Sequence, residues 1–294
     1  MHNLNYPVWT ALVTPLLENG DIDFENLGAL IALQEQVGNA LLILGSTGEA
    51  LALNLEEKQA IIKFIGKLTL KVPVMVGVGG FQLEEQIQWI KFCEQHAKID
   101  AFLLVTPIYA KPGIVGQTKW FEALLNAASK PCMLYNVPGR TAVKLIPEVL
   151  THLKGHNNLW SLKEASGSLD DFKAFQMANL DVTMYSGDDG LVAEHIPLGA
   201  VGVVSVSGNV WPGATHHYVK LCLAEKDPEF AGWTDACDAL FLSSNPIPVK
   251  VLMHEKGLMN SKMLRLPLTA DDFNLEQLKI LLAHDQAVSK WFKE

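Results

Sequence analysis

Short apolar segments rich in β-branched residues recur along the chain, and longer stretches with apolar residues on one helical face separate them. The short segments are typical of strands buried on both faces, and the longer ones are typical of amphipathic helices. Eight strands are predicted in this way, which is the number that closes a parallel barrel. They span residues 8–13, 40–44, 74–78, 101–105, 132–136, 159–163, 182–186 and 201–206.

The helical pattern continues after the last predicted strand, beyond what eight strand–helix units need. The eighth unit's helix is expected to begin near Trp211 and Pro212, and Asn54 and Glu57 have the spacing of a capping box. We predict an α/β fold: a (β/α)8 TIM barrel over residues 1–225 with a C-terminal helical region over residues 226–294. The predicted helices span residues 54–66, 83–96, 117–128, 170–177, 191–198, 214–224, 229–243, 248–256 and 275–292.

Composition narrows the classes of function. The 294 residues are 49% hydrophobic and 19% charged, which is enough to bury one large core. The net charge of −9 argues against a nucleic-acid partner, because nucleic acids attract basic surfaces. No apolar run approaches the ~20 residues of a membrane span, so no membrane association is expected. The cysteines show no metal-binding or disulfide spacing, which indicates free thiols and a cytoplasmic enzyme: Cys93, Cys132, Cys222 and Cys237.

The strand ends carry the candidate chemistry, because functional side chains of such barrels gather at the C-terminal ends of the strands. Lys163 ends the sixth predicted strand and Tyr135 lies at the end of the fifth. Alternation along the strands directs both side chains into the lumen, where they can meet. Burial favours the neutral form of a lysine, and a neutral amine can attack a carbonyl to form a Schiff base. Arg140 follows with a planar guanidinium suited to a carboxylate, so the pattern indicates imine chemistry on an acidic carbonyl substrate.

Two further segments have alternative interpretations. Residues 77–80 are rich in glycine, but they lack dinucleotide-binding spacing and a downstream lysine, so a tight turn is favoured over a phosphate loop. Asp188 and Asp189 could bind a divalent cation as paired carboxylates. No His or third carboxylate lies at ligand spacing nearby, so hydrogen bonding within the loop is favoured.

Five motifs occur in a fixed order along the chain: G-S-T-G-E at 45–49, Y-N-V-P-G-R-T at 135–141, L-K-E-A-S-G at 162–167, S-G-D-D at 186–189 and N-P-I-P-V-K at 245–250. This order resembles the dihydrodipicolinate synthase / N-acetylneuraminate lyase family of class I aldolase-like barrels. The resemblance extends from Thr10 to about Pro267. Arg140, the S-G-D-D motif and the N-P-I-P-V-K motif resemble the synthase branch more than the sialic-acid lyases.

The resemblance implies an activity. Lys163 would form a Schiff base with pyruvate, and the resulting enamine would attack L-aspartate-4-semialdehyde. The product would be 4-hydroxy-tetrahydrodipicolinate, in the first committed step of the diaminopimelate and lysine pathway. Tyr135 would shuttle protons through a relay that includes the hydroxyls of Ser46 and Tyr109. No metal or organic cofactor is implied.

The resemblance also implies substrate-binding residues and an assembly. The amides of the Ser46–Thr47 turn would hold the carboxylate of pyruvate, and Arg140 would bind the carboxylate of the second substrate. Gly187 and the carbonyl of Val204 would line the floor of the site. In the family, the tyrosine that matches Tyr109 crosses from a neighbouring subunit. A tight homodimer is therefore the expected smallest unit, and two such dimers would form a homotetramer.

The chain departs from the synthase pattern at several positions. Synthases usually carry two threonines in place of Ser46 and Thr47, and an aromatic pair in place of Ile108 and Tyr109. Family members inhibited by lysine bind it through polar and aromatic side chains. Because those positions here hold different residues, weak or absent lysine inhibition is expected. The residues at those positions are Ala50, Leu55, Lys58, Phe81 and Ile108.

Two alternative functions remain. One is a pyruvate-releasing class I aldolase that cleaves a 2-keto-3-deoxy sugar acid or N-acetylneuraminate. Arg140 argues against it, since a polyol tail favours neutral donors and acceptors. The other is a non-catalytic, ligand-sensing barrel, because fold alone does not establish activity. Such a sensor would need none of the chemistry of Lys163.

Overall fold

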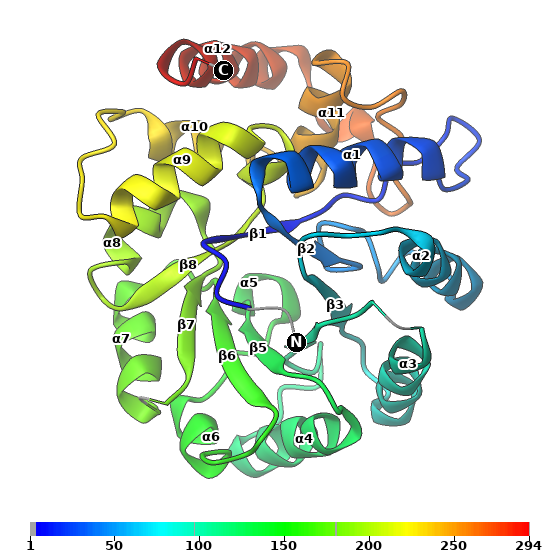
Figure 1. Cartoon of the computed structure of the whole chain (residues 1–294), viewed down its shortest axis with the longest axis vertical. Coiled ribbons are helices and arrows are strands. Elements are labelled where there is room, and N and C mark those ends of the chain that lie inside the picture. The colour runs from blue at the N-terminus through cyan, green and yellow to red at the C-terminus, as the bar shows by residue number, and fades with distance from the viewer. Residues whose placement is uncertain (1–3, 97, 180, 294) are drawn as a thin grey trace.

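The computed structural model describes residues 4–96, 98–179 and 181–293. Eight parallel strands form a closed barrel in which each strand pairs with the next and the last pairs with the first (Figure 1). This confirms the predicted (β/α)8 TIM barrel. The strands are β1 (Val8–Ala11), β2 (Ala40–Ile43), β3 (Val74–Val78), β4 (Ala101–Val105), β5 (Cys132–Asn136), β6 (Leu159–Glu164), β7 (Thr183–Ser186) and β8 (Ala200–Ser205).

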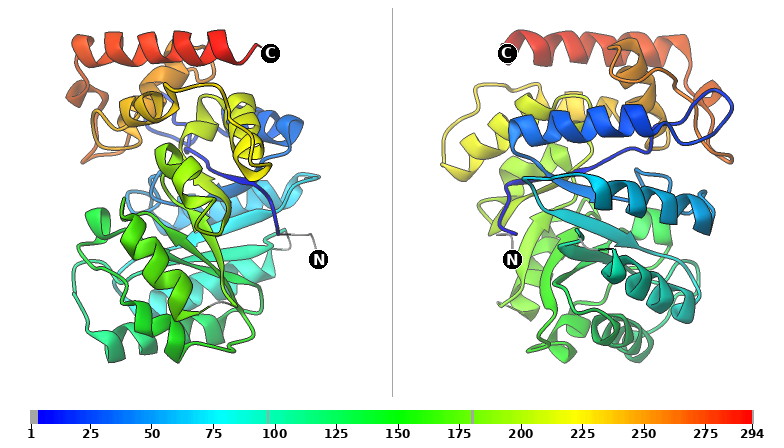
Figure 2. Two further views of the ribbon diagram at one scale, coloured as in Figure 1. Left: turned by 90° about the vertical axis from the view of Figure 1, so that its left-hand side faces the viewer. Right: turned by 45° about the vertical axis from the view of Figure 1, so that its right-hand side comes forward.

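Helices surround the barrel, and the C-terminal ones stack on one side of it. Figure 2 shows α12 outermost, with α10 and α11 between it and the barrel. No helix within the described residues is both long and apolar enough to cross a membrane. The helices are α1 (Phe24–Val37), α2 (Leu55–Lys67), α3 (Leu83–Gln95), α4 (Ile114–Ala127), α5 (Pro138–Thr141), α6 (Pro147–His152), α7 (Leu169–Ala178), α8 (Val192–His195), α9 (Pro212–Leu223), α10 (Trp233–Ala239), α11 (Ile247–Glu255) and α12 (Leu275–Trp291). Single 3-10 turns are η1 (Asp189–Leu191), η2 (Ser207–Asn209) and η3 (Ala270–Asp272).

Two helix starts lie where local sequence signals predict them. Asn54 accepts a hydrogen bond from the Glu57 amide at 2.9 Å, and the Glu57 carboxylate accepts one from the Asn54 amide at 2.9 Å. This is the predicted capping box of α2. Helix α9 begins at Pro212, where the fixed backbone angle of proline suits the first helical position.

Several helices differ from the prediction. Helices α1, α5 and α6 are not among the predicted ones, although Asp23 caps the start of α1 and Gly38 ends it with a φ of 84°. Helix α10 is predicted over residues 229–243 and is shorter at both ends. Glu229 has a φ of 54°, which a right-handed helix does not accommodate, so the helix starts only after Gly232.

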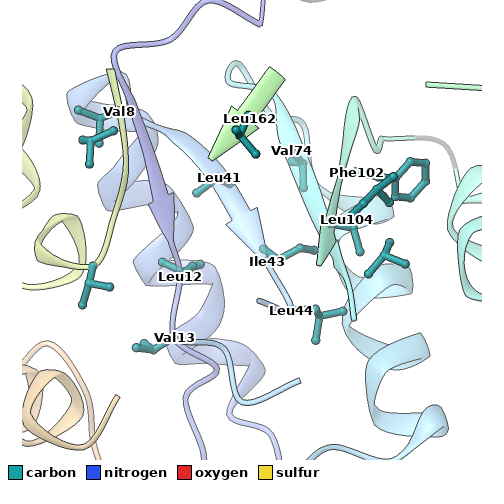
Figure 3. Close-up of a cluster of buried hydrophobic side chains, with 14 of the residues drawn as sticks. Val8, Leu12, Val13, Leu41, Ile43, Leu44, Val74, Phe102, Leu104 and Leu162 are labelled. Carbon is teal, nitrogen blue, oxygen red and sulfur yellow. The ribbon is translucent and has the colours of Figure 1, made fainter. Parts of the chain in front are cut away.

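Alternate residues of each strand face opposite sides of the barrel wall. Val8, Leu41 and Leu162 point outward and pack against the helices in the large cluster drawn in Figure 3. Trp9 and Leu42, their neighbours along β1 and β2, belong to a second cluster that fills the lumen. Burial on both faces explains why the strands read as continuous apolar runs instead of alternating ones.

Aromatic rings fill the lumen toward the N-terminal ends of the strands. The ring centroid of Trp9 lies 6.3 Å from that of Tyr6 and 5.9 Å from that of Trp160. Trp160 in turn lies 5.9 Å from Tyr185, whose hydroxyl donates to the carbonyl of Leu4 at 3.3 Å. These side chains occupy the space that would otherwise connect the two ends of the barrel.

Gly77 allows β3 to pack closely against the turn after β2. A Cβ at this position would lie 2.2 Å from the carbonyl oxygen of Leu44, so the backbone would have to move. We expect Gly77→Ala to lower the free energy of unfolding by about 1–3 kcal/mol or more. Gly66→Ala is the matched control, because Gly66 lies in α2 and a Cβ added there would have no neighbour within 4 Å.

The control should raise the free energy of unfolding by about 0.5–1 kcal/mol, since alanine restricts the unfolded chain and favours helix. Urea denaturation of the two variants beside the parent chain measures both changes. Equal stability of Gly77→Ala and the parent chain would contradict the close approach.

Candidate active site

Lys163 and Tyr135 are direct neighbours on adjacent strands. The register of β5 and β6 pairs Tyr135 with Lys163, and only 5% and 4% of the two residues are exposed. The Nζ atom of Lys163 lies 4.3 Å from the centre of the Tyr135 ring. Tyr135 belongs to the lumen cluster, whereas its strand neighbour Leu134 packs outside the barrel. The predicted meeting of the two side chains is confirmed.

A polar bridge lies behind this pair, on the outer face of the wall. The amide nitrogen of Asn136 donates to Glu164 Oε2 at 2.7 Å, and its oxygen accepts from the backbone N–H of Leu145 at 2.9 Å. The backbone N–H of Ser166 donates to Glu164 Oε1 at 2.7 Å. Burial raises the pKa of Glu164, and these hydrogen bonds oppose that change. The bridge fastens the ends of β5 and β6 in one register.

Gly187 brings the backbone after β7 against Lys163. A Cβ on Gly187 would lie 2.9 Å from Lys163 Cε and 2.4 Å from the Cβ of Ala165. The Gly187 amide also donates to the carbonyl of Glu164 at 2.6 Å. Any larger residue at this position would therefore crowd the lysine side chain.

The two acidic residues after Gly187 differ in their surroundings. Asp188 accepts a hydrogen bond from the Gly167 amide at 3.2 Å. Burial raises the pKa of Asp188 to about 6, and the charge of Lys163 acts in the opposite direction. Asp189 accepts from the amides of Val206 and Ser207 at 2.7 and 3.1 Å, so it holds the loop after β8. Within the described residues, no group of three or more metal-ligating side chains could hold an ion.

His195 supports the same loop, although no motif or spacing in the sequence points to it. The hydroxyl of Ser186 donates to the carbonyl of Asp188 at 2.8 Å, so the 2.8 Å contact with His195 requires the imidazole Nδ1 to be the donor. The ring stacks on Phe172 with centroids 4.5 Å apart. Burial lowers the pKa of His195 to about 4, which keeps the ring neutral near pH 7.

The turn after β2 offers free hydrogen-bond donors. The backbone amides of Ser46, Thr47 and Gly48 donate to no other residue in the described part of the chain. Thr47 is 3% exposed, and its hydroxyl oxygen accepts a hydrogen bond from the Asn245 side chain at 2.9 Å. Ser46 is exposed. Adjacent unpaired amides of this kind can bind an anion such as a carboxylate.

A buried ion pair supports this turn from below. Glu49 has a φ of 55° and accepts from the Nζ of Lys250 at 2.5 Å and from the amide of Arg265 at 2.7 Å. Lys250 is fully buried in α11 and also donates to the carbonyl of Met263 at 2.8 Å. Burial lowers the pKa of Lys250, and the charge of Glu49 opposes that shift. Both residues stand in motifs of the sequence, but no role could be assigned to them there.

Arg140 and Tyr109 lie at the mouth of the site. Arg140 is exposed in α5, and its guanidinium donates to the backbone carbonyl of Asn245 at 3.1 Å. Tyr109 is 85% exposed and has a φ of 69°, and its amide donates to the carbonyl of Thr141 at 3.0 Å. The phenol of Tyr109 is therefore open to a neighbouring molecule.

A cavity of about 400 Å³ opens at this end of the barrel. Ser46, Tyr135 and Arg140 line it, and it extends past Lys58 to Trp89. The other expected site residues are not part of its lining. Val204 is fully buried in the lumen cluster, and Lys163 and Gly187 lie together beside Tyr135. Thr47 is linked to Arg140 by Asn245, which forms a hydrogen bond with each of them.

Removal of the buried lysine should reveal how strongly the turn depends on the ion pair. We expect Lys250→Met to lower the free energy of unfolding by about 3–5 kcal/mol, because Glu49 would be left as an uncompensated buried charge. Lys279→Met is the matched control, since the Lys279–Glu276 pair is exposed on α12. The control should change stability by less than about 1 kcal/mol. Chemical denaturation of both variants measures the difference, and similar small losses would show that Glu49 needs no partner.

Comparisons with known proteins agree with this geometry. The sequence profile described as the Dihydrodipicolinate synthetase family matches residues 6–284. A protein of Francisella philomiragia named 4-hydroxy-tetrahydrodipicolinate synthase is 47% identical over 292 residues, which cover 99% of this chain and 98% of that protein. The protein of the same name from Wolbachia pipientis wMel is 42% identical over 274 residues, covering 92% and 93% of the two chains.

Solved structures give the same result. The chloride-inhibited dihydrodipicolinate synthase of Acinetobacter baumannii, solved with pyruvate, matches with a TM-score of 0.88 and 32% identity over 97% of this chain and 99% of that one. The dihydrodipicolinate synthase of Aquifex aeolicus matches with a TM-score of 0.90 and 29% identity, covering 98% and 100% of the two chains. Profile, relatives and structures extend over almost the entire barrel and its C-terminal helices, and the chain belongs to the dihydrodipicolinate synthetase family.

Proposed function

We propose that this chain condenses pyruvate with L-aspartate-4-semialdehyde to form 4-hydroxy-tetrahydrodipicolinate, through a Schiff base on Lys163. The observation that carries the proposal is the buried Lys163 amine, 4.3 Å from the Tyr135 ring at the carboxyl end of the barrel. The names of the relatives support the same reaction. They give no support to the alternative of an aldolase that releases pyruvate from a sugar acid or N-acetylneuraminate.

The bond changes follow from the chemistry of a buried amine. The Nζ of Lys163, after giving up a proton, attacks the keto carbon of pyruvate, and loss of water gives the imine. Loss of a proton from the methyl group gives the enamine, whose terminal carbon bonds to the aldehyde carbon of the semialdehyde. The amino group of the semialdehyde then attacks the imine carbon, which closes the ring and releases Lys163. One water is lost overall.

Each of these steps moves a proton, and Tyr135 is the proposed carrier. Its ring lies against Lys163, and Ser46 lines the same cavity as Tyr135. The relay would run from Tyr135 through the Ser46 hydroxyl to the phenol of Tyr109. The chemistry requires no metal or organic cofactor, because the imine itself serves as the electron sink.

Tyr109 would reach this relay from a neighbouring copy of the chain. Its 85% exposure supports this arrangement, as does apolar surface at the cavity that its chain neighbour Ile108 lines. Leu51 and Leu266 line the cavity and are 65% and 80% exposed. Exposed apolar side chains of this size at one face favour contact with another protein surface. We infer a homodimer as the smallest complete unit and a dimer of dimers as the assembly, in the cytoplasm.

The proposed carboxylate sites divide between two elements. The free amides of Ser46 and Thr47 would bind the carboxylate of pyruvate, with Gly187 and Val204 on the floor beneath the ketone. The guanidinium of Arg140 would bind the carboxylate of the semialdehyde, because two parallel N–H donors match two carboxylate oxygens. Arg140 lines the cavity through which the second substrate would arrive.

Borohydride trapping tests the covalent step. Incubation with pyruvate and borohydride should leave a reduced pyruvyl adduct on Lys163, located by peptide mass mapping, and the semialdehyde should be turned over. Lys163→Arg should lose the adduct and slow turnover at least about a thousandfold, because the guanidinium forms no imine. Lys144→Ala is the matched control, since the Lys144 side chain is exposed and pairs with Asp171.

The outcomes separate the alternatives. An adduct on Lys163 together with semialdehyde-dependent turnover supports the synthase. The same adduct without that turnover favours the aldolase. The absence of any adduct in the parent chain would show that Lys163 is structural and would leave a non-catalytic barrel as the better explanation.

We also propose that free L-lysine inhibits this enzyme weakly or not at all. The far part of the cavity is lined by Ala50 and Ile108, and the ammonium of Lys58 lies 5.6 Å from the Trp89 ring. A cationic ligand would meet a like charge there, which disfavours binding. Titration of turnover with L-lysine should leave the rate unchanged up to millimolar concentrations, with D-lysine as the control for ionic strength. Strong inhibition below millimolar would contradict the proposal.

A further inference from the structure

Asn245 connects the C-terminal helical region to both proposed carboxylate sites. It lies between α10 and α11 and is 3% exposed. Its side-chain nitrogen lies 2.9 Å from the Thr47 hydroxyl oxygen, and its backbone carbonyl accepts from Arg140 at 3.1 Å. One residue outside the barrel thus contacts a residue proposed for each of the two substrates.

The side-chain contact fixes the direction of a hydrogen bond. An amide NH₂ group can only donate, so the hydroxyl oxygen of Thr47 accepts from Asn245. A hydroxyl carries one proton of its own, which then has to be directed to another acceptor. No acceptor for that proton is found among residues 4–96, 98–179 and 181–293. The proton therefore remains available to a ligand at the turn, beside the free amides of Ser46 and Thr47.

We propose that Asn245 is a positioning residue that sets the Thr47 hydroxyl as a hydrogen-bond donor to the carboxylate of pyruvate. This inference rests on the proposed function, because it assumes that the turn binds that carboxylate. A hydroxyl donating to an ionised acceptor forms a charge-assisted hydrogen bond, which is stronger than one between neutral groups. The C-terminal helical region thereby takes part in substrate binding.

The surrounding structure holds both partners of this contact in place. Lys250 lies on α11, which begins two residues after Asn245. It forms the buried ion pair with Glu49, two residues after Thr47 in the turn. Two short segments are therefore joined twice, once by the Asn245–Thr47 hydrogen bond and once by the ion pair. The hydrogen bond from Arg140 to the backbone carbonyl of Asn245 is a third contact that holds this segment. A donor held so firmly loses little freedom when the ligand binds.

The unused atom of the amide argues against a purely stabilising role. The side-chain oxygen of Asn245 is buried and has no hydrogen-bond partner among the described residues. A buried acceptor without a partner costs stability. An amide that served stability alone would be expected to use both of its polar atoms, whereas this one uses only its donor, toward Thr47.

Asn245→Asp tests the direction of the hydrogen bond with almost no change in shape. A carboxylate can only accept, so the Thr47 proton would turn toward residue 245 and away from the ligand. We expect kcat/KM for pyruvate to fall on the order of tenfold to a hundredfold, mainly through KM. KM for the semialdehyde should change less than about threefold, because Arg140 bonds to a backbone carbonyl that the substitution retains.

Thr47→Val separates this effect from simple charge repulsion. The valine removes the hydroxyl, so adding Asn245→Asp in that background should cost less than about threefold in kcat/KM for pyruvate. Thr47→Ser keeps the hydroxyl, and there the loss caused by Asn245→Asp should remain. A loss of equal size in the valine background would mean that the aspartate repels pyruvate directly, and would overturn the proposal.

Asn245→Ala provides a second variant in case the aspartate disturbs folding. Alanine removes the donor to the Thr47 hydroxyl but adds no acceptor that would turn the hydroxyl proton away from the ligand. The fall in kcat/KM for pyruvate should therefore be smaller than with aspartate, about threefold to tenfold. Wild-type kinetics in both variants, or equal losses for both substrates, would overturn the proposal. Borohydride trapping at saturating pyruvate should still label Lys163 in every variant. Absence of labelling in the parent chain would instead refute the proposed function.

Discussion

The pairing of β5 with β6 is the constraint on which the rest of the site depends. Side chains alternate along a strand, so a slip of β6 by one residue against β5 would turn Lys163 outward and bring Glu164 into the lumen beside Tyr135. The hydrogen bond from Asn136 to Glu164 on the outer face holds the two strands against such a slip. A polar contact that never meets the substrate therefore determines which chemistry the lumen contains.

The C-terminal region performs a similar task for the turn after β2. That turn presents free amides, which leaves its backbone short of internal hydrogen bonds. Glu49 compensates through its ion pair with the fully buried Lys250, and Asn245 contacts Thr47. The region that follows the barrel in sequence is thus part of the wall around the site, and its helices are more than an added layer on the barrel surface (Figure 2).

Local sequence signals predicted the parts of the structure that local physics determines. The eight strands and the lumen orientation of Tyr135 and Lys163 follow from short-range periodicity, and the capping box of α2 follows from the spacing of two residues. The roles of Asn245 and Lys250 could not be predicted, because their partners Thr47 and Glu49 lie 198 and 201 positions away in the sequence. Short-range periodicity contains no information about such contacts. The predicted start of α10 was wrong because Glu229 has a positive φ, in an exposed turn where its amide donates to the Asp227 side chain, and residue periodicity does not report φ.

The aromatic rings in the lower lumen close one end of the site within residues 4–96, 98–179 and 181–293. Trp9, Trp160 and Tyr185 fill the space there, and the cavity opens past Arg140 at the opposite end. Lys163 lies deeper than Arg140, which is exposed at that mouth. A molecule already bound at the mouth would block the path of one that must reach the lysine. If the ketone binds at Lys163 and the aldehyde's carboxylate at Arg140, as proposed, the architecture imposes an order on the two substrates: the ketone is loaded first and the aldehyde follows.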